Sequence, residues 1–381
     1  MNKQVVGFDV PAMVGMSIND IATPSLVLDL DALEWNIQTM GRICKDLNIG
    51  HRAHGKMHKS ADVAKLQMSL GGAVGICCQK VSEAEAFARA GINNILITNQ
   101  VVGAPAINRL IALVGSGIEI ACCVDHFDNV KMLEAAAQNA GVQLNCLVEI
   151  DCGAGRCGVV SPQEAGLLAS YIHQSSALSF QGLQAYQGAL QHLQSHQDRF
   201  QAAAKALQFL EEVLRHLRGL GLSCAVVGGG GTGSFLPEAQ SGLYTELQCG
   251  SYAFMDADYG RIEDEKGERL DAHSWKNALF LLTRVMSKTR SGLAVCDAGL
   301  KSQSVDSGLP LVSQPNDLRY IKCSDEHGIL EDEKDSLAVG DLVYLIPGHC
   351  DPTCNLHDWY VGIRGGLVES VWPITARGKS W

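Results

Sequence analysis

The most constraining feature of this sequence is a regular alternation between short apolar runs and longer amphipathic stretches, which begins near residue 50. The apolar runs are rich in Val, Ile and Cys and have the length of strands: 50–56, 73–79, 94–99, 118–124, 144–151, 179–187, 225–229 and 246–254. The stretches between them predict helices, among them 82–90, 105–113, 129–140, 162–173 and 198–217. Several open on a cap, such as Ser82 with Glu85 or Ser161 with Glu164. Strand–helix alternation implies a parallel sheet, and eight units predict a closed (β/α)8 barrel, with an open doubly wound sheet as the alternative.

The pattern changes after about residue 265, where strand-like runs follow one another with few helices between them. These runs are 278–285, 293–297, 319–322 and 341–346, and residues 23–30 near the start are also strand-like. A chain of 381 residues is long for a single core. We therefore expect a barrel over residues 31–265 and a β-rich domain over 266–381, to which residues 1–30 contribute a strand.

Charge and apolar patterning exclude several classes of protein. The formal net charge of −11 argues against broad binding to nucleic acid or to an anionic membrane. No apolar run reaches the roughly 20 residues of a membrane-spanning helix, and the first residues lack the apolar core of a signal peptide. We expect a cytoplasmic protein, in which the 14 cysteines pack as small buried hydrophobic residues.

The segment His-Gly-Lys-Met-His-Lys at residues 54–59 lies at the predicted end of the first barrel strand. Strand alternation places His54 and Lys56 on one face, and Gly55 between them leaves room for a close approach. An unpaired charge inside a strand is costly to desolvate. Lys56 is therefore either displaced to the surface, in a polar loop, or held for chemistry as an amine.

Polar side chains also follow other predicted barrel strands, where active sites of this fold lie. They include Gln79, Arg156 and Tyr186, with His192 shortly beyond. A glycine run at residues 228–233 follows the seventh strand, a usual place for a phosphate cradle in barrels. It also matches G-x-G-x-x-G, but a dinucleotide fingerprint should follow the first strand of its unit. We predict a phosphate site, with a flexible glycine turn as the alternative.

A lysine on the first strand and a phosphate cradle after the seventh suit pyridoxal phosphate, which needs an amine for a Schiff base and an anchor for its phosphate. Lys56 is in register to point inward, whereas Lys59 falls past the strand end, so we assign the amine to Lys56.

A second constellation is Pro-Gly-His-Cys-Asp-Pro-Thr-Cys-Asn at residues 347–355. His349 and Asp351 share a face if the backbone is extended, and an imidazole with a carboxylate suits a divalent metal. Cys350 would point away, which makes it a weaker ligand candidate. In the alternative interpretation His349 satisfies a buried backbone group and Asp351 caps the turn before Pro352.

Seven collinear motifs carry a resemblance to a known family: HGKMHKS, GICCQKVSEA, EIDCGAGRCGV, LQAYQG, GGGTGS, LQCGSYAFMDADY and PGHCDPTCN. The chain resembles the D-threonine aldolase and D-serine dehydratase family of fold-type III pyridoxal-phosphate enzymes. That resemblance implies an alanine-racemase-like (β/α)8 TIM barrel with a C-terminal β-rich domain, and a homodimer. It makes Lys56 the Schiff-base lysine and His349 and Asp351 the metal ligands, and it places Arg156 near the ring oxygen or the substrate carboxylate. The remaining cofactor contacts that it implies are Gln79, Tyr186, Gly231, Thr232, Gly250, Ser251 and Tyr252.

The second metal ligand distinguishes members of the family. The D-serine dehydratases of the family tend to carry histidine at the first ligand position and cysteine at the second, a pair that suits zinc. The carboxylate of Asp351 is a harder donor that suits magnesium or manganese, with cobalt as a further possibility. This departure favours the aldolases.

The resemblance implies retro-aldol cleavage of a D-3-hydroxy amino acid, with 3-hydroxy-D-aspartate, giving glycine and glyoxylate, as the first candidate. His192 is a candidate for proton transfer. A substrate with a β-carboxylate needs an extra cation, and Arg52, His58 and Lys59 lie nearby in sequence. The alternatives are cleavage of D-threonine to glycine and acetaldehyde, a dehydratase acting on D-serine or 3-hydroxyaspartate, and a carrier protein that binds pyridoxal phosphate without catalysis.

Overall fold

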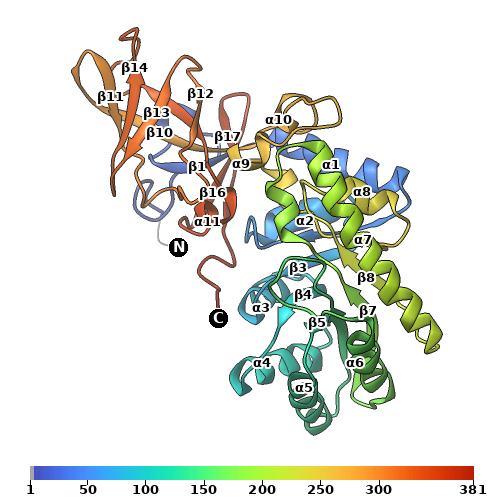
Figure 1. The fold of residues 1–381 in the computed structure, drawn as a ribbon. Helices are drawn as coiled ribbons and strands as arrows, with labels where there is room; N and C mark the ends of the chain where they lie inside the picture. Colours follow the sequence, from blue (N-terminus) through green and yellow to red (C-terminus); the bar gives the residue numbers. More distant parts are fainter. Residues whose placement is uncertain (1–3) are drawn as a thin grey trace.

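Eight parallel strands close into a barrel in the computed structural model, which describes residues 4–381 (Figure 1). In order around the barrel they are β2 (Gly50–His54), β3 (Gly75–Cys78), β4 (Asn94–Gln100), β5 (Glu119–Val124), β6 (Leu144–Glu149), β7 (Leu178–Gln184), β8 (Val226–Gly229) and β9 (Glu246–Leu247). The last strand pairs with the first through Gly50 and Glu246. The closure confirms the predicted (β/α)8 barrel and excludes an open sheet.

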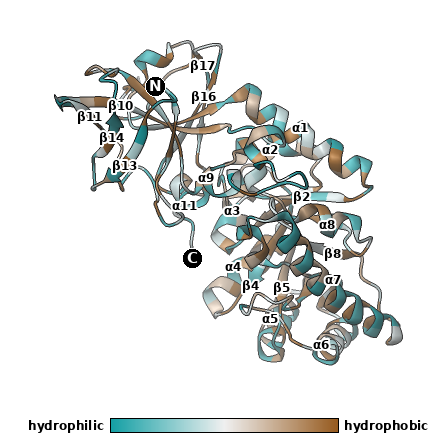
Figure 2. Ribbon diagram, turned by 45° about the horizontal axis from the view of Figure 1, so that its top comes forward, coloured by the Kyte–Doolittle hydropathy of each residue, from teal (hydrophilic) through white to brown (hydrophobic). Residues whose placement is uncertain are grey.

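Helices follow the strands and cover the outside of the barrel (Figure 1). They are α1 (Leu30–Asp46), α2 (Ala61–Ser69), α3 (Val81–Arg89), α4 (Ala104–Gly115), α5 (Phe127–Ala140), α6 (Pro162–Gln174), α7 (His196–Gly219) and α8 (Phe235–Gln240). In α7 the buried side chains of Ala203, Ala206, Leu210, Val213 and Leu217 recur every three or four positions, as an amphipathic helix requires. Figure 2 shows the corresponding alternation of hydrophobic and hydrophilic residues along the outer helices. No helix among residues 4–381 combines the length and the apolar character needed to cross a membrane.

The second lobe is built on a nine-stranded sheet. Its strands are β1 (Ser25–Asp29), β10 (Leu279–Arg290), β11 (Gly292–Cys296), β12 (Leu311–Gln314), β13 (Arg319–Cys323), β14 (Gly328–Asp332), β15 (Leu342–Ile346), β16 (Trp359–Arg364) and β17 (Leu367–Pro373). The order β13-β14-β11-β10-β1-β16-β17 inserts β1, from the start of the chain, between two late strands, and β15 joins β10 to β12. Three further α-helices are short: α9 (Ala257–Gly260), α10 (Leu270–His273) and α11 (Cys350–Cys354).

A buried ion pair closes the floor of the barrel, at the end opposite to the strand termini that carry function. Arg52 Nε on β2 lies 2.8 Å from Glu246 Oε1 on β9, and Arg52 also bonds to Asn94 Oδ1 on β4. The pair therefore links the first and last strands of the barrel.

Three local predictions were wrong in detail. The first barrel strand ends at His54, so Lys56 lies in the following turn rather than in the strand. The last strand stops at Leu247, well short of the predicted residue 254, and Gly250 beyond it packs so closely on His54 that a Cβ there would lie 2.8 Å from the His54 carbonyl oxygen. Ser82 lies inside α3, whose N-cap residue is Lys80, and Glu83 Oε2 accepts a bond from Lys80 N. The 14 cysteines are all free and most are buried, as expected.

Candidate active site

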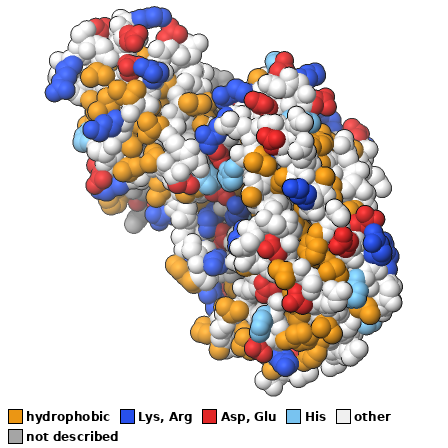
Figure 3. Space-filling model, in the orientation of Figure 1, with side chains coloured by type: hydrophobic (Ala, Val, Ile, Leu, Met, Phe, Trp, Pro, Cys, Tyr) orange, Lys and Arg blue, Asp and Glu red, His pale blue; other side chains and the backbone are white. Residues whose placement is uncertain are grey.

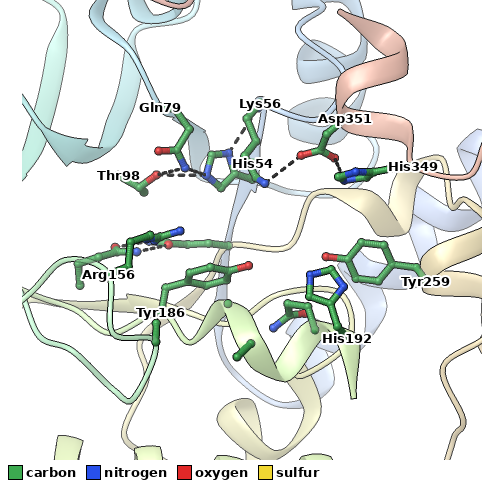
Figure 4. A pocket seen from close by; sticks show the side chains of 16 residues that line it. His54, Lys56, Gln79, Thr98, Arg156, Tyr186, His192, Tyr259, His349 and Asp351 are labelled. Carbon is green, nitrogen blue, oxygen red and sulfur yellow. Dashed lines mark hydrogen bonds and ion pairs between the residues drawn. The ribbon is translucent and has the colours of Figure 1, made fainter. Parts of the chain in front are cut away.

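A cavity of about 360 Å³ lies where the carboxyl ends of the barrel strands face the second lobe. Figure 3 shows basic, acidic and histidine side chains gathered at this junction. The cavity is lined by His54, Lys56, Gln79, Thr98, Ala154, Arg156, Gln184, Tyr186, Gly188, Ala189, Gln191, His192, Gln248, Tyr259, His349 and Asp351 (Figure 4). It thus brings together seven of the residues predicted from the sequence, from segments almost 300 positions apart.

Lys56 lies two residues past the end of β2, and its Nζ is 2.9 Å from Asp351 Oδ2 (Figure 4). The turn that places it there is fixed by backbone bonds from Gly55 N to Cys77 O and from Lys59 N to Gly55 O. The carboxylate of Asp351 raises the pKa of the Lys56 ammonium above its ordinary value. The amine is therefore held as a cation against a carboxylate of the other lobe.

His349 and Asp351 sit at the start of α11 and not on an extended strand. His349 is the extended N-cap residue, and Asp351 belongs to the first turn of the helix. His349 Nε2 lies 4.0 Å from Asp351 Oδ1, so the two groups face the same space. Burial opposes a charge on either group, but the Lys56 ammonium keeps the pKa of Asp351 below its ordinary value. The carboxylate of Asp351, with that of Asp306, raises the pKa of His349 despite its burial.

Asp306 is a residue of this site that the sequence did not indicate. Its Oδ2 lies 2.8 Å from His349 Nδ1. A carboxylate on Nδ1 fixes the proton there and leaves Nε2 as the lone-pair nitrogen, which is how metal-binding histidines are usually oriented. His349 Nε2 and the Asp351 carboxylate therefore fit a divalent cation, and the Lys56 ammonium shows that a cation is accepted beside Asp351.

Within residues 4–381 no group of three or more His, Cys, Asp or Glu side chains is arranged to hold a metal ion. A cation bound by His349 and Asp351 would accordingly keep several coordination positions for water or substrate, as catalytic metals do. Cys350 is buried, with its Sγ 3.6 Å from Asp351 Oδ1.

His54, Gln79 and Thr98 form the wall of the cavity beside Lys56 (Figure 4). His54 Nε2 lies 3.1 Å from Thr98 Oγ1 and 3.2 Å from Gln79 Nε2. Burial, followed by the charge of Lys56, lowers the pKa of His54 to about 3. His54 is therefore a neutral hydrogen-bonding group at neutral pH.

Arg156 lies on the opposite side of the cavity, in a loop between β6 and α6. Asp151 holds that loop by accepting bonds from the backbone N–H groups of Gly153, Ala154 and Gly155. The Arg156 guanidinium carbon lies 5.9 Å from the centre of the Tyr186 ring, and Glu149 is 4.0 Å away. With so loose a counter-ion, this guanidinium is available to an anion in the cavity.

The predicted phosphate cradle borders the cavity without lining it. A Cβ on Gly231 would lie 2.5 Å from Gln191 Oε1, and one on Gly250 would lie 3.2 Å from the Cβ of His54. Within residues 4–381 the backbone N–H groups of Thr232, Gly250 and Ser251 donate to no other group. Close-packed glycines with unengaged N–H donors fit a phosphate group.

The side chains of Thr232 and Tyr252, two further predicted contacts, are bonded within the protein. Thr232 Oγ1 accepts a bond from Tyr252 N at 2.9 Å. The Tyr252 side chain lies in the core, where its hydroxyl accepts a bond from Gln67. The side chain of Tyr252 is therefore not placed to contact a cofactor in the cavity.

None of the three basic residues near Lys56 in sequence faces the cavity. Arg52 is paired with Glu246 at the barrel floor. His58 is buried beside Gln67, and Lys59 is buried with its Nζ 2.7 Å from Glu83. A cationic side chain for a substrate β-carboxylate would therefore have to come from another segment of the chain.

The chain is similar to known proteins both in sequence and in fold. Residues 28–258 match the family described as alanine racemase, N-terminal domain, and residues 278–363 match a putative serine dehydratase domain. A 3-hydroxy-D-aspartate aldolase of Paracoccus denitrificans (strain Pd 1222) is 56% identical over 376 residues, which cover 99% of this chain and 97% of that protein.

Two solved structures share the whole architecture. A D-threonine aldolase from Filomicrobium marinum is 44% identical, with a TM-score of 0.94 that covers 97% of this chain and 100% of its own. A metal-free form of a D-threo-3-hydroxyaspartate dehydratase variant is 23% identical, with a TM-score of 0.83 over 96% of this chain and 100% of its own. These matches confirm the resemblance stated from the seven motifs.

Proposed function

The chain belongs to the alanine-racemase-like family of pyridoxal-phosphate enzymes that includes the 3-hydroxy-D-aspartate aldolases, and we propose that it cleaves 3-hydroxy-D-aspartate to glycine and glyoxylate. The reaction is the retro-aldol cleavage of a carbon–carbon bond in a D-3-hydroxy amino acid. The observation that carries the proposal is the contact of Lys56 with Asp351, beside His349, in one cavity. It joins the amine that a pyridoxal cofactor needs to the residues that a metal needs.

Lys56 is the amine that would hold the cofactor, and the N–H groups of Thr232, Gly250 and Ser251 would hold its phosphate. When bound, pyridoxal phosphate supplies an electron sink for the pair of electrons released from the Cα–Cβ bond. Gln79 and His54 supply polar contacts along the wall next to Lys56. Tyr186 lies under the guanidinium of Arg156 and closes the opposite wall.

His349 and Asp351 would hold the divalent metal, which we propose to be magnesium or manganese, because Asp351 is a hard oxygen donor. A cation bound there polarises a hydroxyl group and eases the loss of its proton. Asp306 orients His349 for this role through its bond to Nδ1. The proposed metal ligands come from the second lobe and Lys56 from the barrel, so a β-hydroxyl group on that metal would lie at the junction of the lobes.

The substrate itself carries two carboxylates and needs cations for both. Arg156 is placed to bind one of them and to keep the amino acid in one orientation. His192, which was also predicted to be catalytic, lines the other wall, and either a proton transfer or an anion contact would use its Nε2.

Cleavage of D-threonine is the second candidate, because a D-threonine aldolase has nearly the same fold at 44% identity. A dehydratase is disfavoured by the carboxylate at position 351, and a carrier protein would have no use for the paired His349 and Asp351. A homodimer remains a prediction from the resemblance, and analytical ultracentrifugation tests it.

A product assay tests the function. The holoenzyme with manganese is incubated with D-3-hydroxyaspartate or with D-threonine, with and without a chelator. We expect glycine and glyoxylate from the first substrate and loss of both products with the chelator. Ammonia and oxaloacetate in place of glycine would refute the aldolase. Lys56→Ala should lose the cofactor's absorbance band and all turnover, whereas Lys65→Ala, a change on the exposed face of α2, should keep both.

A further inference from the structure

Five basic side chains line the cavity, and two of them have no role in holding the cofactor or the metal. Lys56 and His349 are committed to the cofactor and the metal by the proposed function, on which this inference rests. His54 is neutral, because its burial and the charge of Lys56 lower its pKa to about 3. Among the cavity-lining residues this leaves Arg156 and His192 to receive the two carboxylates of 3-hydroxyaspartate.

His192 is held by a buried carboxylate. It ends the 3-10 helix η2 (Gly188–His192), and its Nδ1 lies 3.0 Å from Asp258 Oδ2. The Asp258 side chain is only 5% exposed, and its other oxygen is bonded to Arg261. Within residues 4–381 no group bonds to His192 Nε2, which leaves that nitrogen to the cavity.

The hydrogen bond to Asp258 fixes the imidazole ring of His192 through Nδ1. Arg261 neutralises part of the Asp258 charge and fixes its second oxygen. The arrangement turns the Nε2 edge of a fixed imidazole toward an anion in the cavity.

The backbone places His192 on the metal side of the cavity. Asp258 lies on α9, and the N-cap of that helix, Asp256, accepts a bond from Cys350 N at 2.8 Å, between the two metal-ligand positions. Arg261 contacts the carbonyl oxygen of Ser307, which follows the Asp306 that orients His349. In Figure 4 His192 and Tyr259 accordingly lie toward His349, and Arg156 lies on the far side.

We propose that His192, positioned by Asp258 and Arg261, binds the β-carboxylate of the substrate and selects a carboxylate over a methyl group at Cβ. The β-hydroxyl group belongs beside His349 and Asp351, so a second substituent on the same carbon falls on the His192 side. Arg156 then receives the α-carboxylate.

The test uses two ligands that lack a β-hydroxyl group and therefore cannot undergo retro-aldol cleavage. D-aspartate and D-2-aminobutyrate differ only in a carboxylate or a methyl group on Cβ. Their dissociation constants for the manganese-loaded holoenzyme are read from the change in the cofactor's absorbance. We expect the wild type to prefer D-aspartate, and His192→Gln to reduce that preference by about 10- to 100-fold, as for the loss of a charge-assisted hydrogen bond. Asp258→Asn should act in the same direction with a smaller effect.

His273→Gln is the matched control, because His273 also pairs with a carboxylate, that of Glu268 at 3.5 Å, but outside the cavity. It should leave the preference unchanged. Equal weakening of both ligands in His192→Gln, or no wild-type preference for D-aspartate, would overturn the proposal. Retained binding of D-2-aminobutyrate shows that the variant is folded.

Turnover separates anion binding from proton transfer. If His192 binds the β-carboxylate, His192→Gln lowers the ratio of kcat/KM for D-3-hydroxyaspartate over D-threonine about tenfold or more. If it transfers a proton instead, kcat falls for both substrates, the ratio stays constant and the proposal is wrong. Absence of glycine from either substrate in the wild type would refute the proposed function alone, since the D-aspartate titration still reports the contact with His192.

Discussion

Replacing Lys59 by Met tests whether this lysine stabilises the fold, in contrast to Lys56, which we propose holds the cofactor. Lys59 Nζ lies 2.7 Å from Glu83 Oε1, and the two side chains are 10% and 2% exposed. Removing one partner of a buried ion pair costs about 3–5 kcal/mol. Glu83 Oε2 keeps its bonds from the N–H groups of Gln79 and Lys80 at 2.7 and 3.0 Å. These bonds offset part of the cost, so we expect a loss of about 2–4 kcal/mol.

A double-mutant cycle in urea measures this coupling. The variants are Lys59→Met, Glu83→Gln and the two combined, and the unfolding of each is followed by circular dichroism. The combined variant should be less destabilised than the sum of the single ones by about 1–3 kcal/mol. Folded Lys59→Met should still bind the cofactor and show its absorbance band.

The reasoning is wrong if Lys59→Met has the same urea midpoint of unfolding as the wild type. It is also wrong if this variant loses the cofactor band while its stability is unchanged, because Lys59 would then be the reactive amine. Lys56→Met is the complementary control: it should lose the band at little cost in stability, since its partner Asp351 keeps access to solvent in the cavity.

Two further predictions follow from single residues. Asp306→Ala should weaken manganese binding, measured by isothermal titration calorimetry, about tenfold; this is the low end of the 10- to 100-fold range because the Asp306 side chain is 51% exposed. The control is Asp317→Asn, which changes an exposed carboxylate paired with Lys334 and should leave the affinity for manganese unchanged. An unaltered affinity in Asp306→Ala would contradict the role of Asp306 in orienting His349. Burial raises the pKa of Glu238 from its ordinary 4.5 to about 8. Between these pH values the folded state keeps a proton that the unfolded state has released. The free energy of unfolding therefore falls as the pH rises from 4.5 to about 8. Glu238→Gln should remove that decline, which urea midpoints at about pH 5 and about pH 8 will show, and a decline of wild-type size in the variant would rule Glu238 out as its source.

The barrel was predictable because its signal is local. Each strand is an apolar run of a few residues, and each outer helix has its own amphipathic period, as in α7. The helix α1 (Leu30–Asp46) was not predicted, because it precedes the first barrel strand and so stands outside the strand–helix alternation that begins near residue 50. The extension of the last strand beyond Leu247 was wrong, and the chain there packs Gly250 against His54, almost 200 positions away, a contact that no local pattern indicates.

Site residues could be predicted only where the residues next to them in sequence form a distinctive motif. Lys56, His349 and Asp351 stand in distinctive motifs, and the resemblance supplied their roles. Asp258 and Asp306 carry no such signal, since each acts through a histidine more than 40 positions away. Lys59 illustrates the converse: its proximity to Lys56 in sequence gave no hint of the buried partner, Glu83, that removes it from the cavity.

The position of β1 in the second sheet has a consequence for synthesis of the chain. Val27 pairs with Val361 on β16, so 334 residues separate the partners. At the usual 5–20 residues per second of translation, β1 waits roughly 20 to 70 seconds for this neighbour. The barrel can form meanwhile, with Lys56 in place but without Asp351. A nascent chain therefore contains Lys56 long before Asp351, and the ion pair between the two lobes can form only after residue 351 has been made.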